Sequence, residues 1–453
     1  MATLDESRRI YLIGIGGCSM SGLAQILKAQ GHIVAGSDRE ESQFTEQLRK
    51  LGVTVFIGHK AEQVATSDLV IYSAAIKPTN PEREFAQEHG IPQIERSVAL
   101  GQISERFKEV VAIAGCHGKT TITSMLAYIN DAAKLDATVH VGGFVELLGG
   151  GVRVGGSDTF ITEACEYVQS FLMLSPTIAL INNIDNDHLD CYRDIDHIVS
   201  TFFRFCSLVP PEGVILGCID DEHVRELLPV TDRRYVTYGL HQGDYHADDI
   251  RYDASGNPSF ELIDNGQSRG RVELSVPGTH NVVNAIAAYA VSKELNVPFG
   301  VYTMAIRRFT NTKRRFEYMG ERNGIKVFHD YGHHPNEIRS TLEAATRVPH
   351  GKIFCVFQCN SYTRAKTLFC QDVDCFSDAD EVLVPDIYPG REVDTGLVHA
   401  KDMVAGIVKT GSKATYLPTF GDIRQYLDAH AKQGDIVITV GSGDVYRQTQ
   451  TLL

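Results

Sequence analysis

The stretch Ala114-Gly115-Cys116-His117-Gly118-Lys119-Thr120-Thr121 decides the fold of the middle of this chain. It follows the apolar, β-branched run 110–113 and precedes a helix-compatible stretch, 122–129. A glycine-rich turn between a strand and a helix directs backbone N–H groups toward phosphate oxygens, and the helix dipole and the lysine add positive potential. The Thr120 hydroxyl is a candidate ligand for Mg²⁺. The sequence therefore predicts a phosphate-binding loop and nucleoside triphosphate chemistry.

The loop matches a short form of the phosphate-binding motif. The full Walker pattern has a glycine five residues before Gly118, where this chain has Ile113, so the match is to G-x-x-G-K-T. Because a bare G-K-T also occurs in ordinary helix-entry turns, a turn without a ligand is the alternative. The strand pattern before the loop and the helix pattern after it favour phosphate binding.

Length, charge and cysteine usage limit the class of protein. The chain has 453 residues, of which 57 are acidic and 43 basic, with a formal net charge of −14. This length predicts several domains, and we expect three. An acidic surface repels polyanions, so nucleic acid is not an expected partner. The ten cysteines form no C-x-x-C pair, which favours a reduced, cytoplasmic chain.

The sequence contains no candidate membrane segment. Residues 1–9 are polar and acidic, unlike an export signal. No stretch approaches the ~18 consecutive apolar residues that a membrane-spanning helix needs. We therefore expect no membrane insertion and no export.

Short apolar runs alternate with amphipathic segments of helix length, and this alternation starts three times along the chain. The pattern is typical of largely parallel sheets flanked by helices, so the predicted fold class is α/β. We expect a Rossmann-like N-terminal domain at 1–107, a P-loop ATPase-like central domain at 108–311 and a Rossmann-like C-terminal domain at 312–453. The expected strands are 10–15, 33–37, 69–73, 110–113, 159–163, 178–182, 213–217, 325–329, 352–357, 381–385 and 435–440, and the expected helices include 19–29, 122–129, 195–208 and 285–294.

A second glycine-rich turn lies near the N-terminus. Gly14-Ile15-Gly16-Gly17-Cys18-Ser19-Met20-Ser21-Gly22 follows a strand and opens a helix, and Asp38 ends the next strand. The spacing is that of a dinucleotide fingerprint, with Ser19 in place of the usual third small residue. It predicts a diphosphate site, which either a nicotinamide cofactor or a nucleotide sugar would fill. A tight turn without a ligand is the alternative.

Polar residues follow two strands of the predicted central domain. Glu163 ends the strand 159–163, and Asn182-Asn183-Ile184-Asp185-Asn186-Asp187-His188 follows the strand 178–182. Ligands of open α/β sheets collect beyond the carboxyl ends of the strands, so Glu163 could complete a Mg²⁺ site begun by Thr120. His188 is the weaker candidate because Mg²⁺ prefers oxygen, and a structural histidine is its alternative.

Further candidate ligands lie beyond the central sheet. Asn281 and Asn284 lie one helical turn apart on one face and could read an adenine edge, although asparagine also caps helices. Arg315 lies in the connection to the C-terminal domain, Asp330-Tyr331-Gly332-His333-His334-Pro335 follows a strand directly, and Tyr362-Thr363-Arg364 follows another. A carboxylate and two imidazoles at a strand end predict a cleft between domains, with solvated loops as the alternative.

Taken in order, these motifs resemble those of the Mur ligases, over residues 10 to about 445. They read G-I-G-G-x-x-M, G-x-H-G-K-T-T, E-A-x-E, N-I-x-x-D-H, H-N-x-x-N, R-R-F, D-Y-G-H-H-P and Y-T-R. The resemblance implies that the N-terminal domain binds a UDP-sugar, the central domain binds ATP and Mg²⁺, and the C-terminal domain closes over both and receives an amino acid. In the most similar branch, an ATP-dependent ligase joins L-alanine to the lactyl carboxylate of UDP-N-acetylmuramate through an acyl phosphate, in cytoplasmic peptidoglycan precursor synthesis. We expect a monomer or a homodimer.

The resemblance also implies residue roles. The UDP end would contact Gly14, Gly16, Gly17, Ser19, Ser37, Asp38 and Ser73, and the remaining substrate residues would be Tyr331, His334, Tyr362 and Arg364, the last two near the amino acid. ATP would contact Gly115, Cys116, His117, Gly118, Lys119, Thr120, Thr121, Asn281, Asn284, Arg315 and Asp330. The metal ligands would be Thr120, Glu163 and His188, and the catalytic residues Lys119, His188, Arg315 and His333.

Three positions depart from the family pattern. Cys116 stands where threonine is usual, and Asn360-Ser361 replaces a histidine followed by arginine or threonine near the expected amine pocket. Several sister ligases use a carbamylated lysine soon after the Asp-His motif, but the first lysine after His188 is Lys293, so we do not expect that modification.

Three other functions stay open at this point. A related ligase that attaches a preformed peptide to the same nucleotide sugar shares most of the motifs. A nicotinamide-dependent oxidoreductase would use the Gly14 loop but leave Lys119 and Glu163 without a role. A non-catalytic nucleotide-binding regulator would result if the altered amine pocket were inactive.

Overall fold

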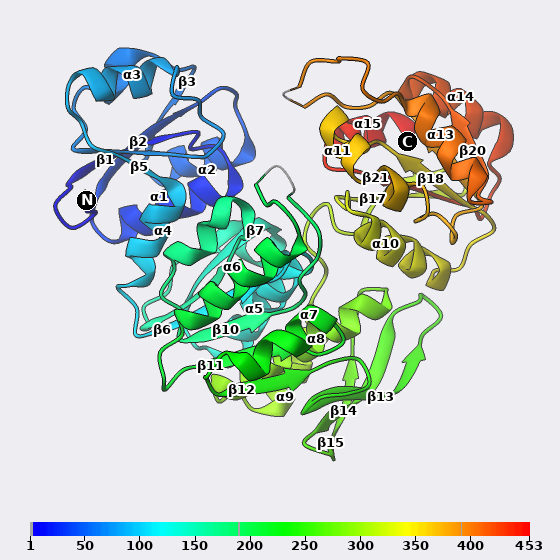
Figure 1. Ribbon diagram of the computed structural model, residues 1–453, viewed down its shortest axis with the longest axis horizontal. Helices are drawn as coiled ribbons and strands as arrows, with labels where there is room; N and C mark the ends of the chain where they lie inside the picture. Colours follow the sequence, from blue (N-terminus) through cyan, green and yellow to red (C-terminus); the bar gives the residue numbers. More distant parts are fainter. Residues whose placement is uncertain (1–2, 189–190, 391) are drawn as a thin grey trace. The chain divides into compact units, whose positions relative to one another are not determined.

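The computed structural model describes residues 3–188, 191–390 and 392–453, and these build three sheets flanked by helices (Figure 1). The chain forms two compact units. The first comprises Met1–His246, Asp264–Gln267 and Asn284–Ala305, and the second comprises Ala247–Ile263, Ser268–Val283 and Ile306–Leu453. The sheets confirm the predicted three-domain α/β class. The domain boundaries at residues 107 and 311 stay predictions.

The N-terminal sheet has five strands in the order β3-β2-β1-β4-β5, and its strands pair in parallel. Strand β1 is buried after its first residue and lies at the centre, where the strand order reverses, so the glycine-rich loop that follows it lies at the usual ligand position of such sheets. The strands are β1 (Arg9–Ile13), β2 (Ile33–Asp38), β3 (Thr54–Ile57), β4 (Leu69–Tyr72) and β5 (Gln93–Glu95). The helices are α1 (Cys18–Ala29), α2 (Gln43–Lys50), η1 (Ala61–Val64), α3 (Pro81–Glu88) and α4 (Arg96–Ser104).

The central sheet has ten strands in the order β15-β14-β13-β12-β11-β10-β6-β9-β7-β8. Strands β10, β6, β9 and β7 pair in parallel, whereas β8 is antiparallel to β7. The strands are β6 (Glu109–Ala114), β7 (Thr138–Val145), β8 (Gly150–Arg153), β9 (Thr159–Glu163), β10 (Ile178–Ile181), β11 (Val214–Cys218), β12 (Tyr235–Tyr238), β13 (Tyr245–Tyr252), β14 (Pro258–Asp264) and β15 (Gln267–Glu273). The helices are α5 (Lys119–Ala133), η2 (Glu146–Leu148), η3 (Tyr167–Met173), α6 (Ile195–Ser207), α7 (Glu222–Leu227), η4 (Leu228–Val230), α8 (Thr279–Glu294) and α9 (Phe299–Arg308).

The C-terminal sheet has six strands in the order β16-β17-β21-β18-β19-β20, parallel except for the edge strand β16. The strands are β16 (Glu317–Arg322), β17 (Ile325–Asp330), β18 (Ile353–Phe357), β19 (Glu381–Val384), β20 (Ala414–Tyr416) and β21 (Ile436–Val440). The helices are α10 (Pro335–Arg347), α11 (Tyr362–Thr367), α12 (Phe369–Asp372), α13 (Ala400–Lys409), α14 (Phe420–His430), α15 (Val445–Thr449) and η5 (Gln450–Leu452).

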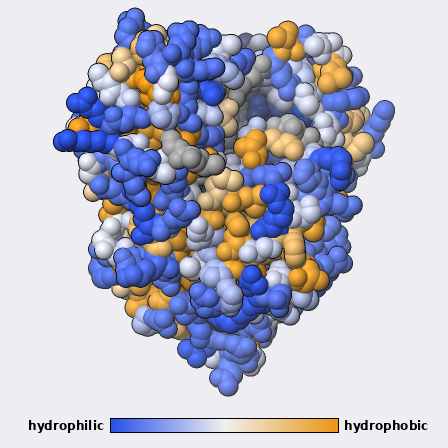
Figure 2. Space-filling view, turned by 60° about the vertical axis from the view of Figure 1, so that its left-hand side comes forward, coloured by the Kyte–Doolittle hydropathy of each residue, from blue (hydrophilic) through white to orange (hydrophobic). Residues whose placement is uncertain are grey.

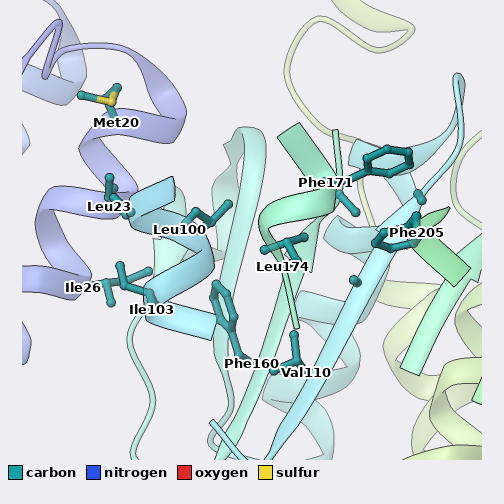
Figure 3. Packing of buried hydrophobic residues seen from close by; sticks show 14 of the residues in the cluster. Met20, Leu23, Ile26, Leu100, Ile103, Val110, Phe160, Phe171, Leu174 and Phe205 are labelled. Carbon is teal, nitrogen blue, oxygen red and sulfur yellow. The ribbon is translucent and has the colours of Figure 1, made fainter. Parts of the chain in front are cut away.

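One apolar core joins the N-terminal sheet to the central sheet within the first unit (Figure 3). Apolar residues at helical spacing place Met20, Leu23 and Ile26 of α1 in this core, together with Leu100 of α4. Phe160 of β9 is fully buried on the side of the central sheet. The loop at the start of α1 is therefore fixed against the central sheet by hydrophobic burial.

The surface matches the acidic, polar composition. Hydrophilic residues dominate the face in Figure 2, with apolar residues in smaller groups between them. In the part of the chain that the structure describes, no helix has both the length and the apolar composition to cross a membrane.

Phe171 offers a test of the shared core. Its ring stacks on Phe205 at 4.6 Å between centroids and meets Phe202 edge-on at 5.1 Å. We expect Phe171→Ala to lower the free energy of unfolding by about 3–5 kcal/mol, because it leaves a cavity among buried rings. Met173→Ala, at a side chain that is 44% exposed, is the control and should change stability by less than about 0.5 kcal/mol. Thermal and urea unfolding of both variants measure this, and equal effects would contradict the packing described.

Candidate functional site

The predicted phosphate loop lies between the end of β6 and the start of α5. Gly115 and Gly118 have φ of +134° and +85°, a region that favours glycine. A Cβ on Gly118 would lie 2.6 Å from the Asn182 side-chain nitrogen and 2.8 Å from the Asn284 side-chain oxygen. Glycine is thus required at this turn for both backbone conformation and space.

The residues after β10 hold the loop through hydrogen bonds. The Cys116 N–H donates to the Asn183 carbonyl at 3.2 Å, and the His117 N–H donates to the Asn183 side chain at 2.7 Å. The side-chain amides of Asn182 and Asn183 both donate to the His117 carbonyl at 3.1 Å. The His117 imidazole lies 2.8 Å from the Asp185 carboxylate. These contacts fix the loop on the sheet.

Lys119 begins α5 and is held by a buried counter-ion. Its ammonium lies 2.8 and 3.0 Å from the two carboxylate oxygens of Glu166, which is 1% exposed, and donates to the Gly115 and Cys116 carbonyls. Burial opposes the charged form, but Glu166 outweighs it and raises the pKa of Lys119 above its usual value. Although burial alone would raise the pKa of Glu166, Lys119 and His188 hold it below its usual value.

The predicted metal ligands have different partners: Thr120 and Glu163 contact each other, whereas His188 contacts Glu166. The Thr120 hydroxyl donates to the Glu163 carboxylate at 3.1 Å, and the Gly142 N–H donates to its other oxygen at 2.5 Å. The His188 imidazole lies 3.5 Å from the Glu166 carboxylate, which ties it to Lys119. Thr120 and Glu163 supply the hard oxygen donors that Mg²⁺ prefers, so they fit that ion better than the imidazole does.

The backbone around His188 and Glu166 is strained. Val168, Gln169 and His188 have φ of 47°, 56° and 55°, and the first of these is β-branched. Such conformations cost of order 1–3 kcal/mol each and persist where the surrounding structure enforces them. The Tyr167 ring lies on His188 at 5.0 Å between centroids. The strain therefore lies beside the Lys119–Glu166 pair.

The two asparagines of α8 do not cap it, because the helix already begins at Thr279. Asn281 and Asn284 are 2% and 4% exposed. Asn281 donates to the Pro277 carbonyl at 2.7 Å, and Asn284 approaches the phosphate loop at Gly118. Thr121, the remaining predicted ATP ligand of this region, is buried in the first turn of α5.

The N-terminal glycine loop is closed by its own contacts. The Gly14 N–H donates to the Ser37 carbonyl at 2.8 Å, the Gly17 N–H to the Gly14 carbonyl at 3.2 Å, and the Gly16 N–H to the Asp38 carboxylate at 2.8 Å. The Ser73 hydroxyl lies beside the loop, 3.6 Å from where a Cβ on Gly14 would be. Asp38 thus positions the loop.

Two predicted substrate serines have buried partners. The Ser37 hydroxyl donates to the Glu82 carboxylate at 2.7 Å, and the same oxygen of Glu82 lies 2.8 Å from the His59 imidazole. The Ser19 hydroxyl accepts from Arg96 at 3.1 Å and lies 3.2 Å from the imidazole of His140. Both hydroxyls therefore hold the loop and the end of β2 in place.

In the second unit, the end of β17 forms a cluster around Glu337. The Asp330 carboxylate accepts from the N–H groups of Phe316 at 2.8 Å and Gly332 at 2.6 Å, and burial raises its pKa against the opposing effect of Arg315. Arg315 donates to Glu337 at 3.3 Å, and the His333 N–H donates to it at 3.0 Å. The Glu337 carboxylate thus brings two predicted residues, Arg315 and His333, together.

Tyr331 and His334 complete this cluster. Arg314 and Arg315 lie 4.5 and 5.4 Å from the Tyr331 ring centroid, within the range of cation–π attraction. His334 is 1% exposed and is the N-cap residue of α10, where its ring accepts from the Asn336 N–H. The His-His-Pro motif therefore also starts a helix.

The expected amine pocket lies at the start of α11. Ser361 has φ 65° and ψ 148°, outside the usual range for a serine, and its hydroxyl accepts from the Arg364 N–H. The Asn360 side chain donates to the Ser442 hydroxyl at 2.7 Å. Tyr362 opens the helix, and all four residues are partly exposed. Two of the positions that depart from the family pattern thus shape this helix start.

Sequence reasoning did not assign roles to several residues of the site. Glu166 is the last residue of the E-A-x-E motif, and its contact with Lys119 precedes the turn at 168–169. Glu337 carried a signal, since it is the third residue of a helix that follows His-His-Pro. The sequence around Arg96 and His140 contains no comparable motif, because their contacts with Ser19 join segments more than seventy residues apart.

Comparisons with known proteins agree along the whole chain. Three family models match, described as the Mur ligase family catalytic domain at residues 9–108, the Mur ligase middle domain at 113–292 and the Mur ligase glutamate ligase domain at 314–443. A UDP-N-acetylmuramate–L-alanine ligase of Caldanaerobacter subterraneus subsp. tengcongensis is 45% identical over 451 residues, which cover 99% of this chain and 98% of that protein. A protein of the same name from Alkaliphilus metalliredigens is 45% identical over 453 residues, with the same coverage.

Solved structures agree as well. UDP-N-acetylmuramate-alanine ligase MurC from Thermotoga maritima has a TM-score of 0.81 at 27% identity, covering 98% of both chains. A murein peptide ligase from Psychrobacter arcticus has a TM-score of 0.72 at 26% identity, also covering 98% of both. The ordered motifs, the three sheets and the full-length similarity lead to one conclusion: this chain belongs to the Mur ligase family.

Proposed function

We propose that the protein is an ATP-dependent ligase that joins L-alanine to the lactyl carboxylate of UDP-N-acetylmuramate in peptidoglycan precursor synthesis. The observation that carries this proposal is the phosphate-loop site, in which Lys119, Thr120 and Glu163 are preassembled. Similarity at 45% identity to proteins named as this ligase supports the choice of substrates. A cytoplasmic location is proposed with it, and the ten free cysteines are consistent with a reducing compartment.

The chain's own residues would bind the triphosphate through the loop between β6 and α5. The N–H groups at the start of α5 and its dipole favour phosphate oxygens. Lys119 would move from Glu166 to the β and γ phosphates, since a bound polyphosphate offers its ammonium a stronger counter-charge. Asn284, beside Gly118, would hold the nucleotide from the α8 side.

Thr120 and Glu163 would hold Mg²⁺, with His188 close by through Glu166. The ion would neutralise charge on the transferred phosphoryl group. Mg²⁺ keeps several water or phosphate ligands, so two protein oxygens suffice on the protein side.

The N-terminal loop would hold the UDP moiety at Gly14, Gly16 and Gly17, with Asp38 fixing the loop from behind. By motif, Arg315 and His333 belong to the phosphate side of the reaction and Asp330 to the ribose. Tyr331, His334, Tyr362 and Arg364 are assigned to the substrate and the amino acid in the same way.

The reaction needs activation because a carboxylate is a poor electrophile. A lactyl carboxylate oxygen attacks the γ phosphorus, ADP leaves, and the resulting acyl phosphate has a good leaving group. The alanine amine then displaces phosphate to form the amide. Positioning and electrostatic stabilisation carry most of such a phosphoryl transfer, which is the work that Lys119 and the loop N–H groups are placed to do.

A ligase for a preformed peptide is the second candidate. Asn360 and Ser361 differ from the family pattern at the expected amine pocket, and this difference is the reason to consider a different amine substrate. The chain is 45% identical to a protein named as an alanine ligase and 26% identical to the murein peptide ligase. This difference favours a single amino acid over a preformed peptide as the amine substrate.

The proposal predicts phosphate release that depends on both cosubstrates. With ATP and Mg²⁺, purified protein should release phosphate only when UDP-N-acetylmuramate and L-alanine are both present, and chelation of Mg²⁺ should stop it. A malachite-green assay with mass spectrometry of the product measures this. Turnover with L-alanyl-γ-D-glutamyl peptide but not alanine would support the peptide ligase, and no release with either would contradict both.

Lys119→Ala tests the division of labour within the first unit. We expect it to abolish turnover, by about a thousandfold or more, because the transferred phosphoryl group loses its main cationic partner. Binding of UDP-N-acetylmuramate, measured by calorimetry, should be nearly intact, because its loop follows β1. Lys108→Ala, at a side chain that is 86% exposed, is the control and should retain activity. Equal loss of turnover and of UDP-sugar affinity in Lys119→Ala would argue against separate sites.

A further inference from the structure

Polar contacts of the buried His140 link the N-terminal glycine loop to strand β9, beside the proposed metal ligand Glu163. The His140 imidazole, 3% exposed on β7, has its Nε2 atom 3.2 Å from both the hydroxyl and the carbonyl oxygen of Ser19. Its Nδ1 atom lies 3.2 Å from the hydroxyl of Thr162 on β9. Both ring nitrogens are therefore engaged, one on each side.

The contacts assign the proton on the ring. Burial lowers the pKa of His140 to about 4, so the ring is neutral at physiological pH and carries one N–H. A carbonyl oxygen accepts only, so Nε2 carries the hydrogen toward Ser19, and Nδ1 faces the Thr162 hydroxyl as an acceptor. The Thr162 hydroxyl also lies 3.3 Å from the Glu163 carbonyl oxygen, to which it can donate. Arg96 donates to the Ser19 hydroxyl at 3.1 Å, so Arg96 and His140 both donate toward Ser19.

The pairing of β7 with β9 places Thr162 next to His140 and Glu163 on the opposite face of the sheet. His140 and Thr162 are direct neighbours in the β7–β9 pairing. Successive residues of a strand point to opposite faces, so Thr162 faces His140 while the next residue, Glu163, presents its carboxylate to Thr120. Movement of the end of β9 on one face therefore moves the proposed metal ligand on the other.

Helix α1 approaches the His140 ring closely at Gly22. A Cβ on Gly22 of α1 would lie 2.8 Å from the ring and 3.4 Å from Val152. The neighbouring Cys18 thiol is 3.7 Å from the Val141 carbonyl, which attaches the same loop to β7 a second time. Figure 1 shows α1 beside β7. The start of α1 and the end of β9 are thus held in one register.

We infer that His140 is a positioning residue that couples the loop at Gly14–Ser19 to the Glu163 carboxylate, so that occupancy of the first by a nucleoside diphosphate sugar strengthens nucleotide binding at the second. The inference rests on the proposed function for the identity of both ligands. Such coupling is a reciprocal free energy, typically a five- to 150-fold change in affinity. Because the coupling is reciprocal, each ligand tightens the binding of the other, which favours the complex that holds both.

The test compares nucleotide affinity with and without the sugar nucleotide. In the full-length wild type, calorimetry with Mg²⁺ and a non-hydrolysable ATP analogue should give an affinity at least fivefold higher when UDP-N-acetylmuramate is saturating. His140→Phe keeps a ring but loses both nitrogens, and it should reduce this ratio to less than about twofold. Asparagine and glutamine variants each keep contact on one side only, and both should also lose coupling.

Val152→Ala is the matched control because it removes packing at the same interface without touching the polar chain. It should destabilise the fold to a similar extent, measured by thermal unfolding, yet keep the wild-type ratio. A ratio of one in the wild type, an unchanged ratio in His140→Phe, or an equal loss in Val152→Ala would each overturn the inference while leaving the ligase activity standing. Absence of binding of both ligands to the wild type would instead remove the proposed function, and the inference with it.

Discussion

A largely buried lysine at the start of a helix must be kept charged, and much of the site's structure follows from this constraint. Lys119 satisfies it through a carboxylate that is itself almost fully buried, and isolated charges in such surroundings are expensive. Glu166 reaches the loop only because the segment after it turns through two left-handed residues, and the strained His188 packs against the same turn. The strained residues therefore lie beside the Lys119–Glu166 pair.

Within the first unit, different contacts hold the phosphate loop and the N-terminal glycine loop in place. A phosphate loop needs a rigid base, which the asparagines after β10 supply through hydrogen bonds to the loop backbone. A substrate loop needs a fixed distance to that base, and the shared apolar core between α1, α4 and β9 supplies it. Polar contacts of His140 then join the loop at Ser19 to strand β9.

Much of the fold followed from sequence because its parallel strands are largely continuous apolar runs, as at β6, β10 and β21. The strands that were missed are polar, short or, as in β7, interrupted by glycines. Strand β13, Tyr245–Tyr252, has only two buried residues, and β16 is an edge strand with charged residues. For the site, the strand-end residues were predictable by type, whereas Glu166 with Lys119, Glu337 with Arg315, and His140 with Ser19 depend on tertiary contacts that spacing does not encode.

The central claim is that the phosphate-loop site activates a carboxylate by phosphoryl transfer, and an isotope experiment tests it most directly. UDP-N-acetylmuramate labelled with oxygen-18 in its lactyl carboxylate is turned over with ATP and L-alanine, and the released phosphate is analysed by mass spectrometry. If the carboxylate oxygen attacks the γ phosphorus, the released phosphate carries oxygen-18. Unlabelled phosphate, formed at the same rate as the amide, would contradict the account.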